Sequence, residues 1–299
     1  MNIAVMGAGA IGSLFGGLLS EHNDVVLIGR KHHVEAINRK GLSIDGKTKL
    51  AVKISAVESV NKLPFIPEFL ILSVKSFDTE TAMKEAKKII GENTVVISIQ
   101  NGLDNVEKIS KYLPHNRIFI CITTHGVVFS KPGSIIHTGV GKTTIGALNG
   151  KKTMELTAVI EKFNTSNIKT NYSKDIVRDI WIKAIVNSSI NPLTTIFQCN
   201  NGNLLKNPIL EKIVEKICEE STNIANSENL NLSCNEMIKK TKEVINETSE
   251  NKSSMLQSFL QGKKTEIDSI NGMLLKIARK NNVKSMLNEV LVNIISNQQ

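Results

Sequence analysis

The fold of this chain follows from a stretch near its amino terminus, Ile3-Ala4-Val5-Met6-Gly7-Ala8-Gly9-Ala10-Ile11-Gly12. A short apolar run, typical of a buried strand, passes into the pattern G-x-G-x-x-G and then into a helical pattern. In such a loop the first glycine permits a tight turn, the second lets the backbone approach a pyrophosphate, and the third lets helix and strand pack closely. The helix amino terminus adds free N–H groups and a positive dipole end for phosphate. The candidate dinucleotide contacts are Gly7, Ala8, Gly9, Ala10, Ile11 and Gly12.

The amino-terminal half alternates short apolar runs with helical patterns, and this alternation is typical of a parallel sheet. Each run is short and rich in β-branched or aromatic residues, as strands buried on both faces are. With right-handed crossovers they form a Rossmann-type, doubly wound α/β sheet. The expected strands are Ile3–Met6, Val25–Ile28, Phe69–Val74, Val95–Ile99 and Arg117–Ile120. The expected helices between them include Ala10–Ser20 and Thr79–Ile90.

The pattern changes in the second half of the chain. Ser134–His137 and Thr143–Ala147 are separated by a segment that contains glycine, so we expect a late hairpin or edge strands that close the first domain. From Asp175 onward, apolar residues recur at helical spacing, and strand-like alternation is nearly absent. The boundary should lie in the polar stretch Asn164–Lys174. We therefore predict a Rossmann-type domain over residues 1–168, followed by an all-helical domain over residues 169–299.

Composition and charge exclude several classes of protein. With 299 residues, 41% of them hydrophobic and 22% charged, the chain is typical of a globular protein with two domains. The 37 Lys and Arg residues are spread among 28 acids without an arginine-rich run, so the net charge of +9 does not indicate nucleic-acid binding. A positive balance suits anionic ligands, because it raises their local concentration.

Cysteine usage and hydropathy indicate the compartment. The four cysteines form no C-x-x-C pair and have no histidines at zinc spacing, so we expect reduced thiols and no metal site. Glycines interrupt the apolar stretch over the first twenty residues, which therefore predicts neither a secretory signal nor a membrane span. We expect a cytoplasmic protein that does not bind membranes.

The residues that follow the second, third and fourth strands indicate which dinucleotide binds. Where NAD enzymes usually place Asp or Glu, this chain has Arg30, which can hold a ribose 2′-phosphate bidentately. The alternative for Arg30 is a solvated surface charge. Lys75 lies at the carboxyl edge of the sheet, where ligands bind, and is a second cofactor candidate. Asn101 precedes a glycine at the same edge and is a candidate contact to cofactor and substrate, or an ordinary turn residue. The pattern favours NADP(H).

The segment Trp181–Pro192 contains the strongest candidate for chemistry. Lys183, Asn187 and Asn191 stand at i, i+4 and i+8, which aligns one ammonium and two amides on a single stripe of a helix. An inward stripe of this kind needs a polar ligand, and its lysine can protonate a carbonyl oxygen as hydride arrives. The alternative is an exposed polar stripe. Pro192 is expected to bend or end the helix.

Taken together, these blocks resemble the ketopantoate reductases, NADPH-dependent enzymes that make pantoate for pantothenate and coenzyme A. The resemblance covers nearly the whole chain, with modest departures at Lys252, which is usually apolar in this motif, and at Gly126-Val127, where an Ala pair is commoner. The blocks are Gly7–Gly12, Gln100-Asn101-Gly102, Thr123-Thr124-His125-Gly126, Trp181–Asn187, Ile190–Thr194, Asn200-Asn201-Gly202, Glu250–Gln257 and Thr265–Gly272.

The resemblance implies a reaction and a set of site residues. The reaction is the NADPH-dependent reduction of 2-dehydropantoate (ketopantoate) to (R)-pantoate, with Lys183 as general acid. Glu266 would reach the nicotinamide side of NADPH, and Arg30, Lys75 and the backbone at Val127 would complete the cofactor site. The substrate pocket would be lined by Lys183, Asn187, Asn191, Asn201, Asn251, Ser254 and Asn101, the last of which would also touch the cofactor.

Two alternatives stay open. One is a reductase of the same fold that acts on another branched 2-oxoacid, because one methylene changes discrimination by only about 10- to 200-fold. The other is a non-catalytic NADP(H)-sensing protein, which would keep Gly7, Gly9 and Arg30 but would need no proton donor. The resemblance also implies a homodimer.

Overall fold

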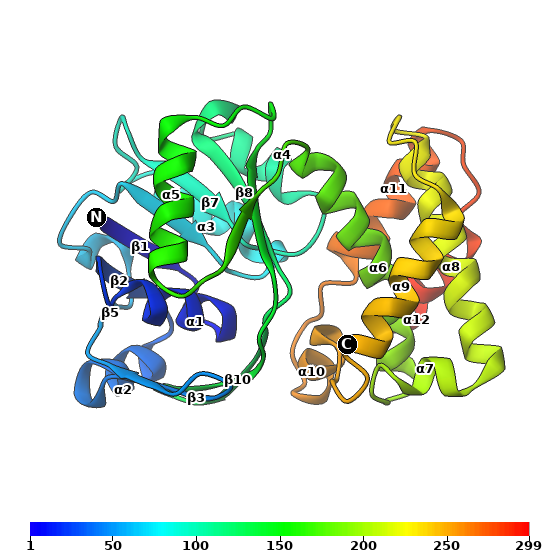
Figure 1. Ribbon diagram of the computed structural model, residues 1–299, viewed down its shortest axis with the longest axis horizontal. Coiled ribbons are helices and arrows are strands. Elements are labelled where there is room, and N and C mark those ends of the chain that lie inside the picture. Colours follow the sequence, from blue (N-terminus) through cyan, green and yellow to red (C-terminus); the bar gives the residue numbers. More distant parts are fainter. Residues whose placement is uncertain (299) are drawn as a thin grey trace. The chain divides into compact units, whose positions relative to one another are not determined.

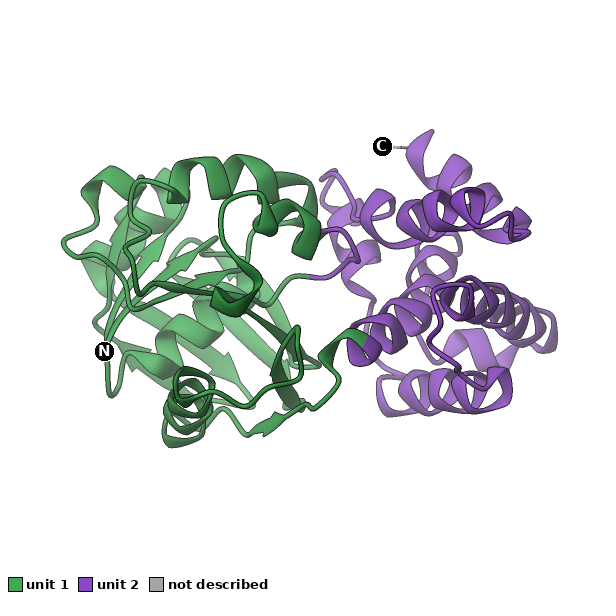
Figure 2. Cartoon of the chain, turned by 90° about the horizontal axis from the view of Figure 1, so that it is seen from above, with its two compact units in different colours: residues 1–100, 105–177 green, residues 101–104, 178–299 purple. Residues whose placement is uncertain are grey.

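The computed structural model describes residues 1–298 and divides the chain into two compact units, which Figure 2 colours separately. Unit 1 consists of Met1–Gln100 and Asn105–Val177, and unit 2 consists of Asn101–Asp104 and the chain from Arg178 onward. Among the described residues, no helix combines the length and the apolar character that crossing a bilayer requires.

Unit 1 contains a large sheet of eight strands in the order β12-β11-β8-β7-β6-β1-β2-β5 (Figure 1). The strands from β8 to β5 are parallel to one another, whereas β11 runs antiparallel to β8. The Rossmann-type sheet is confirmed, and all five predicted strands are present in it. The bounds are β1 (Asn2–Met6), β2 (Asp24–Ile28), β5 (Ser55–Val57), β6 (Phe69–Leu72), β7 (Val95–Ser98), β8 (Ile118–Thr123), β11 (Thr143–Ala147) and β12 (Thr170–Tyr172).

The first strand shows why these apolar runs form a sheet buried on both faces. Successive side chains of a strand point to opposite faces. Ile3 and Val5 share a core with Phe15 and Phe163, whose rings meet edge to face with centroids 5.6 Å apart, and Ala4 is fully buried on the other face. The helices of unit 1 are α1 (Ala10–Leu19), α2 (Lys31–Lys40), η1 (Val60–Lys62), η2 (Ser76–Asp78), α3 (Thr79–Ala86), α4 (Asn105–Ser110), η3 (His115–Arg117) and α5 (Met154–Thr165).

A small sheet of four strands, in the order β4-β3-β10-β9, is a second feature of unit 1 that the sequence analysis missed. The prediction of a hairpin between Ser134–His137 and Thr143–Ala147 is wrong, because the first segment pairs with β3 and β9 and the second pairs with β8 in the large sheet. The true hairpin lies one strand earlier, around a turn in which Gly133 has a φ of +79°. The strands are β3 (Leu42–Gly46), β4 (Leu50–Val52), β9 (Gly126–Lys131) and β10 (Ser134–Gly139).

The division between the units lies further along the chain than the predicted boundary at residues 168 and 169. β12 follows that position, and it pairs in parallel with β11 from Thr143↔Thr170 to Ile145↔Tyr172, so the large sheet includes it. The chain leaves unit 1 after Val177, within the helix α6 (Ile176–Ile196). Backbone pairing that joins β12 to a distant strand is invisible in the local polarity from which the boundary was predicted.

Every regular element described in unit 2 is helical, as predicted. α6 continues through Pro192, which therefore does not end it. Polar caps set several helix starts: Asn207 accepts hydrogen bonds from the N–H groups of Ile209 and Leu210, and Ser233 and Ser253 each accept one from the residue three positions on. The remaining elements are α7 (Asn203–Lys206), α8 (Pro208–Asn226), α9 (Cys234–Glu247), α10 (Ser254–Leu260), the π-helical turn η4 (Asp268–Gly272), α11 (Met273–Lys280) and α12 (Met286–Ser296).

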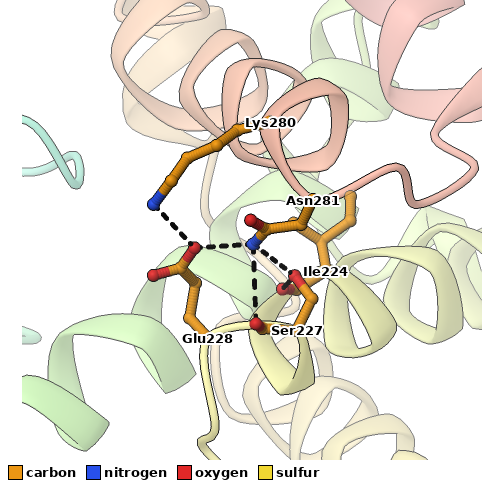
Figure 3. A network of polar contacts seen from close by, with 5 residues as sticks. All are labelled: Ile224, Ser227, Glu228, Lys280 and Asn281. Atoms are coloured by element: carbon orange, nitrogen blue, oxygen red, sulfur yellow. Dashed lines mark hydrogen bonds and ion pairs between the residues drawn. The ribbon is translucent and has the colours of Figure 1, made fainter.

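A polar clamp joins the carboxyl-terminal ends of α8 and α11 (Figure 3). The Asn281 side-chain amide donates to Glu228 Oε1 at 2.6 Å and to Ser227 Oγ at 2.9 Å, and Ser227 Oγ in turn donates to the Ile224 carbonyl at 2.7 Å. Lys280 Nζ lies 3.4 Å from the same Glu228 oxygen. These contacts tie the two helix ends together through side chains.

Candidate active site

The glycine loop of unit 1 has one glycine for each mechanical need. Gly7 has a φ of +103°, and a Cβ there would lie 2.6 Å from the Val74 nitrogen. A Cβ on Gly12 would overlap the Gly7 carbonyl oxygen and Ser73 Oγ. Gly9 differs, because a Cβ there would meet no protein atom within 4 Å. The open space is therefore at the second glycine, where the backbone of such a loop approaches a pyrophosphate.

Hydrogen bonds fix the loop in place, and the first turn of the following helix supplies donors for a ligand. The amides of Gly7 and Ala8 both donate to the Ile28 carbonyl at 3.0 Å, which holds the loop against the end of β2. α1 starts at Ala10 without a side-chain cap from Gly9, so the N–H groups of its first turn have no helical acceptor. The residues present therefore fit a bound pyrophosphate.

The other cofactor candidates of unit 1 follow strands that neighbour β1. β1 lies between β2 and β6, so the segments after these three strands share one edge of the large sheet. Arg30 follows β2, is exposed, and has no carboxylate partner among the ion pairs of the described chain, whereas the adjacent Lys31 lies 3.9 Å from Glu35. Lys75 follows β6 and is half-buried. Two cations thus stand at the edge that carries the glycine loop.

Gln100, which the sequence analysis quoted in its motif but gave no role, fixes this edge. Its side-chain amide donates to the Val74 carbonyl at 2.9 Å and to Thr79 Oγ1 at 2.7 Å. Ser73, at the end of β6, donates to the Gly7 carbonyl at 2.8 Å. The segment that carries Lys75 is therefore held to both β7 and the glycine loop. In the sequence, the only sign of this role is that Gln100 belongs to the Gln-Asn-Gly motif.

Val127 lies on β9 of the small sheet, opposite His137 of β10. Beside it, His137 Nε2 lies 2.9 Å from His125 Nδ1, and the amide of Gly141 donates to the same nitrogen of His125 at 3.2 Å. Burial, with a smaller contribution from His137, lowers the pKa of His125 to about 4. Burial also lowers the pKa of His137. The chain around Val127 is thus held by neutral imidazoles at physiological pH.

In unit 2, the predicted stripe lies on α6. Lys183 and Asn187 are half-buried, and Asn191 is 5% exposed, so the stripe is not a fully solvated helix face. Burial of polar side chains is unfavourable unless they find partners. The arrangement suits a ligand that carries a carbonyl, a carboxylate or a hydroxyl group.

Asn201 and Asn251 are brought together although a long stretch of helices separates them in sequence. The amide of Asn201 donates to the Asn251 carbonyl at 2.9 Å, and Asn201 Nδ2 donates to Thr248 Oγ1 at 2.8 Å. Asn201 Oδ1 is buried without a partner among the described residues. Ser254, at the start of α10, is exposed, whereas its neighbour Ser253 is buried as the helix cap. The unpaired oxygen of Asn201 is a free acceptor for a ligand hydroxyl.

Asn101 and Glu266 are also brought together in unit 2. Asn101 Nδ2 lies 3.5 Å from Glu266 Oε2, and the Leu103 amide donates to the Ser269 carbonyl at 3.1 Å. Glu266 is 6% exposed, and Gly102, with a φ of +97°, makes the turn between Asn101 and Leu103. The Asn-Gly turn is therefore packed against the segment that carries Glu266, and it is more than an exposed loop.

Comparisons with known proteins support the resemblance. Residues 3–150 match the family described as Ketopantoate reductase PanE/ApbA, and residues 175–299 match Ketopantoate reductase PanE/ApbA C terminal. A 2-dehydropantoate 2-reductase of Pyrococcus abyssi is 38% identical, with 100% of this chain and 98% of that protein covered. The chain belongs to the ketopantoate reductase family. A second 2-dehydropantoate 2-reductase, of Pyrococcus horikoshii, is 39% identical over 97% of this chain and 95% of its own length.

Solved structures of the family and of related enzymes share the fold. A PanE/ApbA family ketopantoate reductase from Ralstonia eutropha has a TM-score of 0.92 and 26% identity, with 100% of this chain and 98% of that one covered. A D-mandelate dehydrogenase with NADH and anilino(oxo)acetate has a TM-score of 0.93 and 28% identity with the same coverage. This ketopantoate reductase family member is accordingly an oxidoreductase.

Proposed function

We propose that this oxidoreductase reduces 2-dehydropantoate to (R)-pantoate with NADPH, a step that supplies pantothenate and coenzyme A. The observation that carries the proposal is the half-buried stripe of Lys183, Asn187 and Asn191 on α6. It offers one acid and two neutral amides, which suits a 2-oxoacid that carries a hydroxyl group. The name of the two Pyrococcus relatives supports the same substrate.

The chemistry follows from the donor set. NADPH, when bound, supplies the hydride that adds to C2 of the oxoacid. As the C2–H bond forms and the carbonyl π bond breaks, the Lys183 ammonium donates a proton to the developing alkoxide, and its charge stabilises that oxygen. The neutral lysine regains a proton from water. Asn187 and Asn191 bind and orient the substrate without adding negative charge beside its carboxylate.

Each of the remaining candidates has a proposed ligand. Asn201, Asn251 and Ser254 would contact the substrate, with the unpaired Oδ1 of Asn201 as acceptor for its hydroxyl. Asn101 and Glu266, 3.5 Å apart, would meet the nicotinamide side of the cofactor. The loop Gly7–Gly12, with Lys75 and the backbone at Val127, would hold the rest of the dinucleotide.

The preference for NADPH over NADH is proposed from Arg30. Its guanidinium is exposed, follows β2, and has no carboxylate partner in the described chain. A guanidinium matches the geometry of a phosphate bidentately. The D-mandelate dehydrogenase structures contain NADH, and a comparison of the two cofactors tests the preference.

The D-mandelate dehydrogenase likeness also favours a second candidate, a reductase of another 2-oxoacid. Its TM-score of 0.93 is as high as the 0.92 of the ketopantoate reductase from Ralstonia eutropha. The fold therefore does not determine which 2-oxoacid is reduced. The residues that line the substrate pocket determine it. The non-catalytic NADP(H) sensor has no such support, because the relatives of this chain are reductases.

The test is oxidation of NADPH by purified protein with 2-dehydropantoate, followed by its absorbance, beside NADH as cofactor and ketoisovalerate and pyruvate as substrates. Strong preference for 2-dehydropantoate with NADPH supports the proposal. Preference for another oxoacid moves the protein to the second candidate. NADPH binding without turnover of any of these oxoacids refutes the proposed reaction.

The family resemblance further supports a homodimer in the cytoplasm. Light scattering coupled to size-exclusion chromatography measures the mass in solution, and a monomer at working concentration contradicts the dimer.

A further inference from the structure

The helix that carries the proposed acid has a gap in its own hydrogen bonding. Pro192 lies inside α6 and has no N–H, so the carbonyl of Ser188, four residues earlier, lacks its helical donor. Ser188 lies between Asn187 and Asn191 in sequence, so its carbonyl belongs to the helical turn that joins these two residues. Helices bend at prolines because this bond is lost and the ring crowds the carbonyl. The turn between Asn187 and Asn191 therefore lacks one backbone hydrogen bond of α6.

One side chain from another element fills this gap. Asn271, fully buried in the π-helical turn η4, donates from Nδ2 to the Ser188 carbonyl at 3.1 Å. The second hydrogen of the same amide goes to Asn288 Oδ1 at 2.9 Å. Asn271 thus supplies the hydrogen bond that Pro192 cannot.

A carboxylate sets the direction of these bonds. Glu220 Oε1 can only accept when ionised, and it receives Asn288 Nδ2 at 2.8 Å. Asn288 must therefore present its Oδ1 to Asn271, and Asn271 must present its Nδ2 to Asn288 and Ser188. If the Asn271 amide were reversed, its oxygen would face two other acceptors, the Ser188 carbonyl and Asn288 Oδ1. Asn271 is hence a donor to α6.

The turn that holds Asn271 is also the turn that follows Glu266. The Glu266 carbonyl accepts from the amides of Ser269 and Ile270 at 3.1 Å, and the Gly272 amide reaches back to the Ile267 carbonyl at 3.0 Å in a π-type bond. π-helical turns are frequent at functional sites. One buried amide thus links the turn between Asn187 and Asn191 to the segment of Glu266, all within unit 2.

We propose that Asn271 is a positioning residue of the reductase: by replacing the hydrogen bond lost at Pro192, it keeps Lys183, Asn187 and Asn191 in line and in register with Glu266. This inference rests on the proposed function. Asn271 touches neither substrate nor cofactor in the proposed site, and it acts through the backbone of α6.

The test is a double-mutant cycle with a backbone rescue. Asn271→Ala leaves the Ser188 carbonyl without a donor, whereas Pro192→Ala restores an N–H that donates to that carbonyl. Asn271→Ala should lower kcat about 10- to 100-fold, the range for a displaced catalytic group. Its Kd for NADPH should stay within about twofold of wild type, because the glycine loop is untouched. In the Pro192→Ala background, the added Asn271→Ala change should lower kcat by no more than about twofold.

Asn281→Ala is the matched control. It also removes an asparagine amide that joins two helix ends of unit 2, but its partners, Ser227 and Glu228, form no hydrogen bond with α6 in the described part of the chain (Figure 3). It should lower thermal stability and leave kcat within about twofold. A fall of kcat in Asn281→Ala that equals the fall in Asn271→Ala overturns the proposal, since general loosening of unit 2 would then suffice.

Amide hydrogen exchange separates failure of this inference from failure of the proposed function. Residues 183–191 should lose protection in Asn271→Ala and regain it in the double variant, whatever the enzyme turns over. Equal loss in both variants overturns the positioning role. Wild-type protein without turnover refutes the proposed function, and the exchange pattern then decides the role of Asn271 in α6.

Discussion

Substitution of Gly9 by alanine separates folding from cofactor binding in the glycine loop. The new Cβ would meet no protein atom within 4 Å, and Gly9 has a φ of −82°, which alanine adopts without strain. Two backbone effects oppose each other: alanine is a poorer N-cap than glycine by about 1 kcal/mol, and it restricts the unfolded chain by about 0.4–1 kcal/mol. The variant should therefore keep its melting temperature within about 4 °C of wild type.

Cofactor binding should respond differently, because the methyl group would occupy the space that a pyrophosphate needs. Forcing an extra methyl group into a packed contact costs about 1–3 kcal/mol, which raises Kd about 5- to 150-fold. At an NADPH concentration of about 100 times the wild-type Kd, the ligand stabilises wild type by about 2.7 kcal/mol. With a Kd raised about 100-fold, the same concentration stabilises Gly9→Ala by only about 0.4 kcal/mol.

The assay is thermal unfolding with and without NADPH, joined to a fluorescence titration of NADPH binding. Gly12→Ala is the contrasting variant, because its Cβ would overlap the Gly7 carbonyl oxygen and Ser73 Oγ, so it should melt earlier even without cofactor. Gly9→Ala that binds NADPH as tightly as wild type would refute the assignment of this loop. A large fall in melting temperature without cofactor would refute the claim that the space above Gly9 is open.

Three further predictions concern the acid, the cofactor preference and pH. Lys183→Ala should lower kcat about 10²–10⁴-fold while NADPH affinity stays near wild type, and unchanged turnover would remove Lys183 from the mechanism. Arg30→Ala should raise KM for NADPH by about 10-fold or more, as expected for a lost charged hydrogen bond, and leave KM for NADH unchanged; an equal rise for both cofactors would contradict a 2′-phosphate contact. His125, with a pKa near 4 when folded against 6.5 otherwise, binds fewer protons in the folded state, so chemical denaturation should show stability falling as pH drops from about 6.5 to about 4. His125→Gln should flatten that dependence, and an equally steep dependence in the variant would assign it to other groups.

The large sheet could be predicted because its information is local. Strands such as Val25–Ile28 are continuous apolar runs, and the glycines at 7, 9 and 12 meet needs of one turn. The small sheet could not, because β10 pairs with β3 from a distant part of the chain. The Pro132-Gly133 dipeptide is typical of a turn, and it was the one local feature that indicated the β9–β10 hairpin.

The candidate site also combines features that are local in sequence with features that depend on tertiary packing. The spacing of Lys183, Asn187 and Asn191 is a property of one helix, so it could be predicted from sequence. Their partial burial could not, because it depends on which elements of unit 2 pack against α6. Gln100 and Asn271 gained roles only from their hydrogen bonds to Val74 and Ser188, each on another element.

By itself the sequence determined the five predicted parallel strands of the large sheet, the helical character of unit 2, the glycine loop, the cation after β2 and the amide stripe of α6, because each depends on neighbours along the chain. Only the tertiary structure decided that Asn101 lies 3.5 Å from Glu266, that Asn201 keeps a buried oxygen without a partner, and that Asn271 replaces the hydrogen bond missing at Pro192. These contacts join residues far apart in sequence, and their geometry is set by packing, which no local pattern encodes.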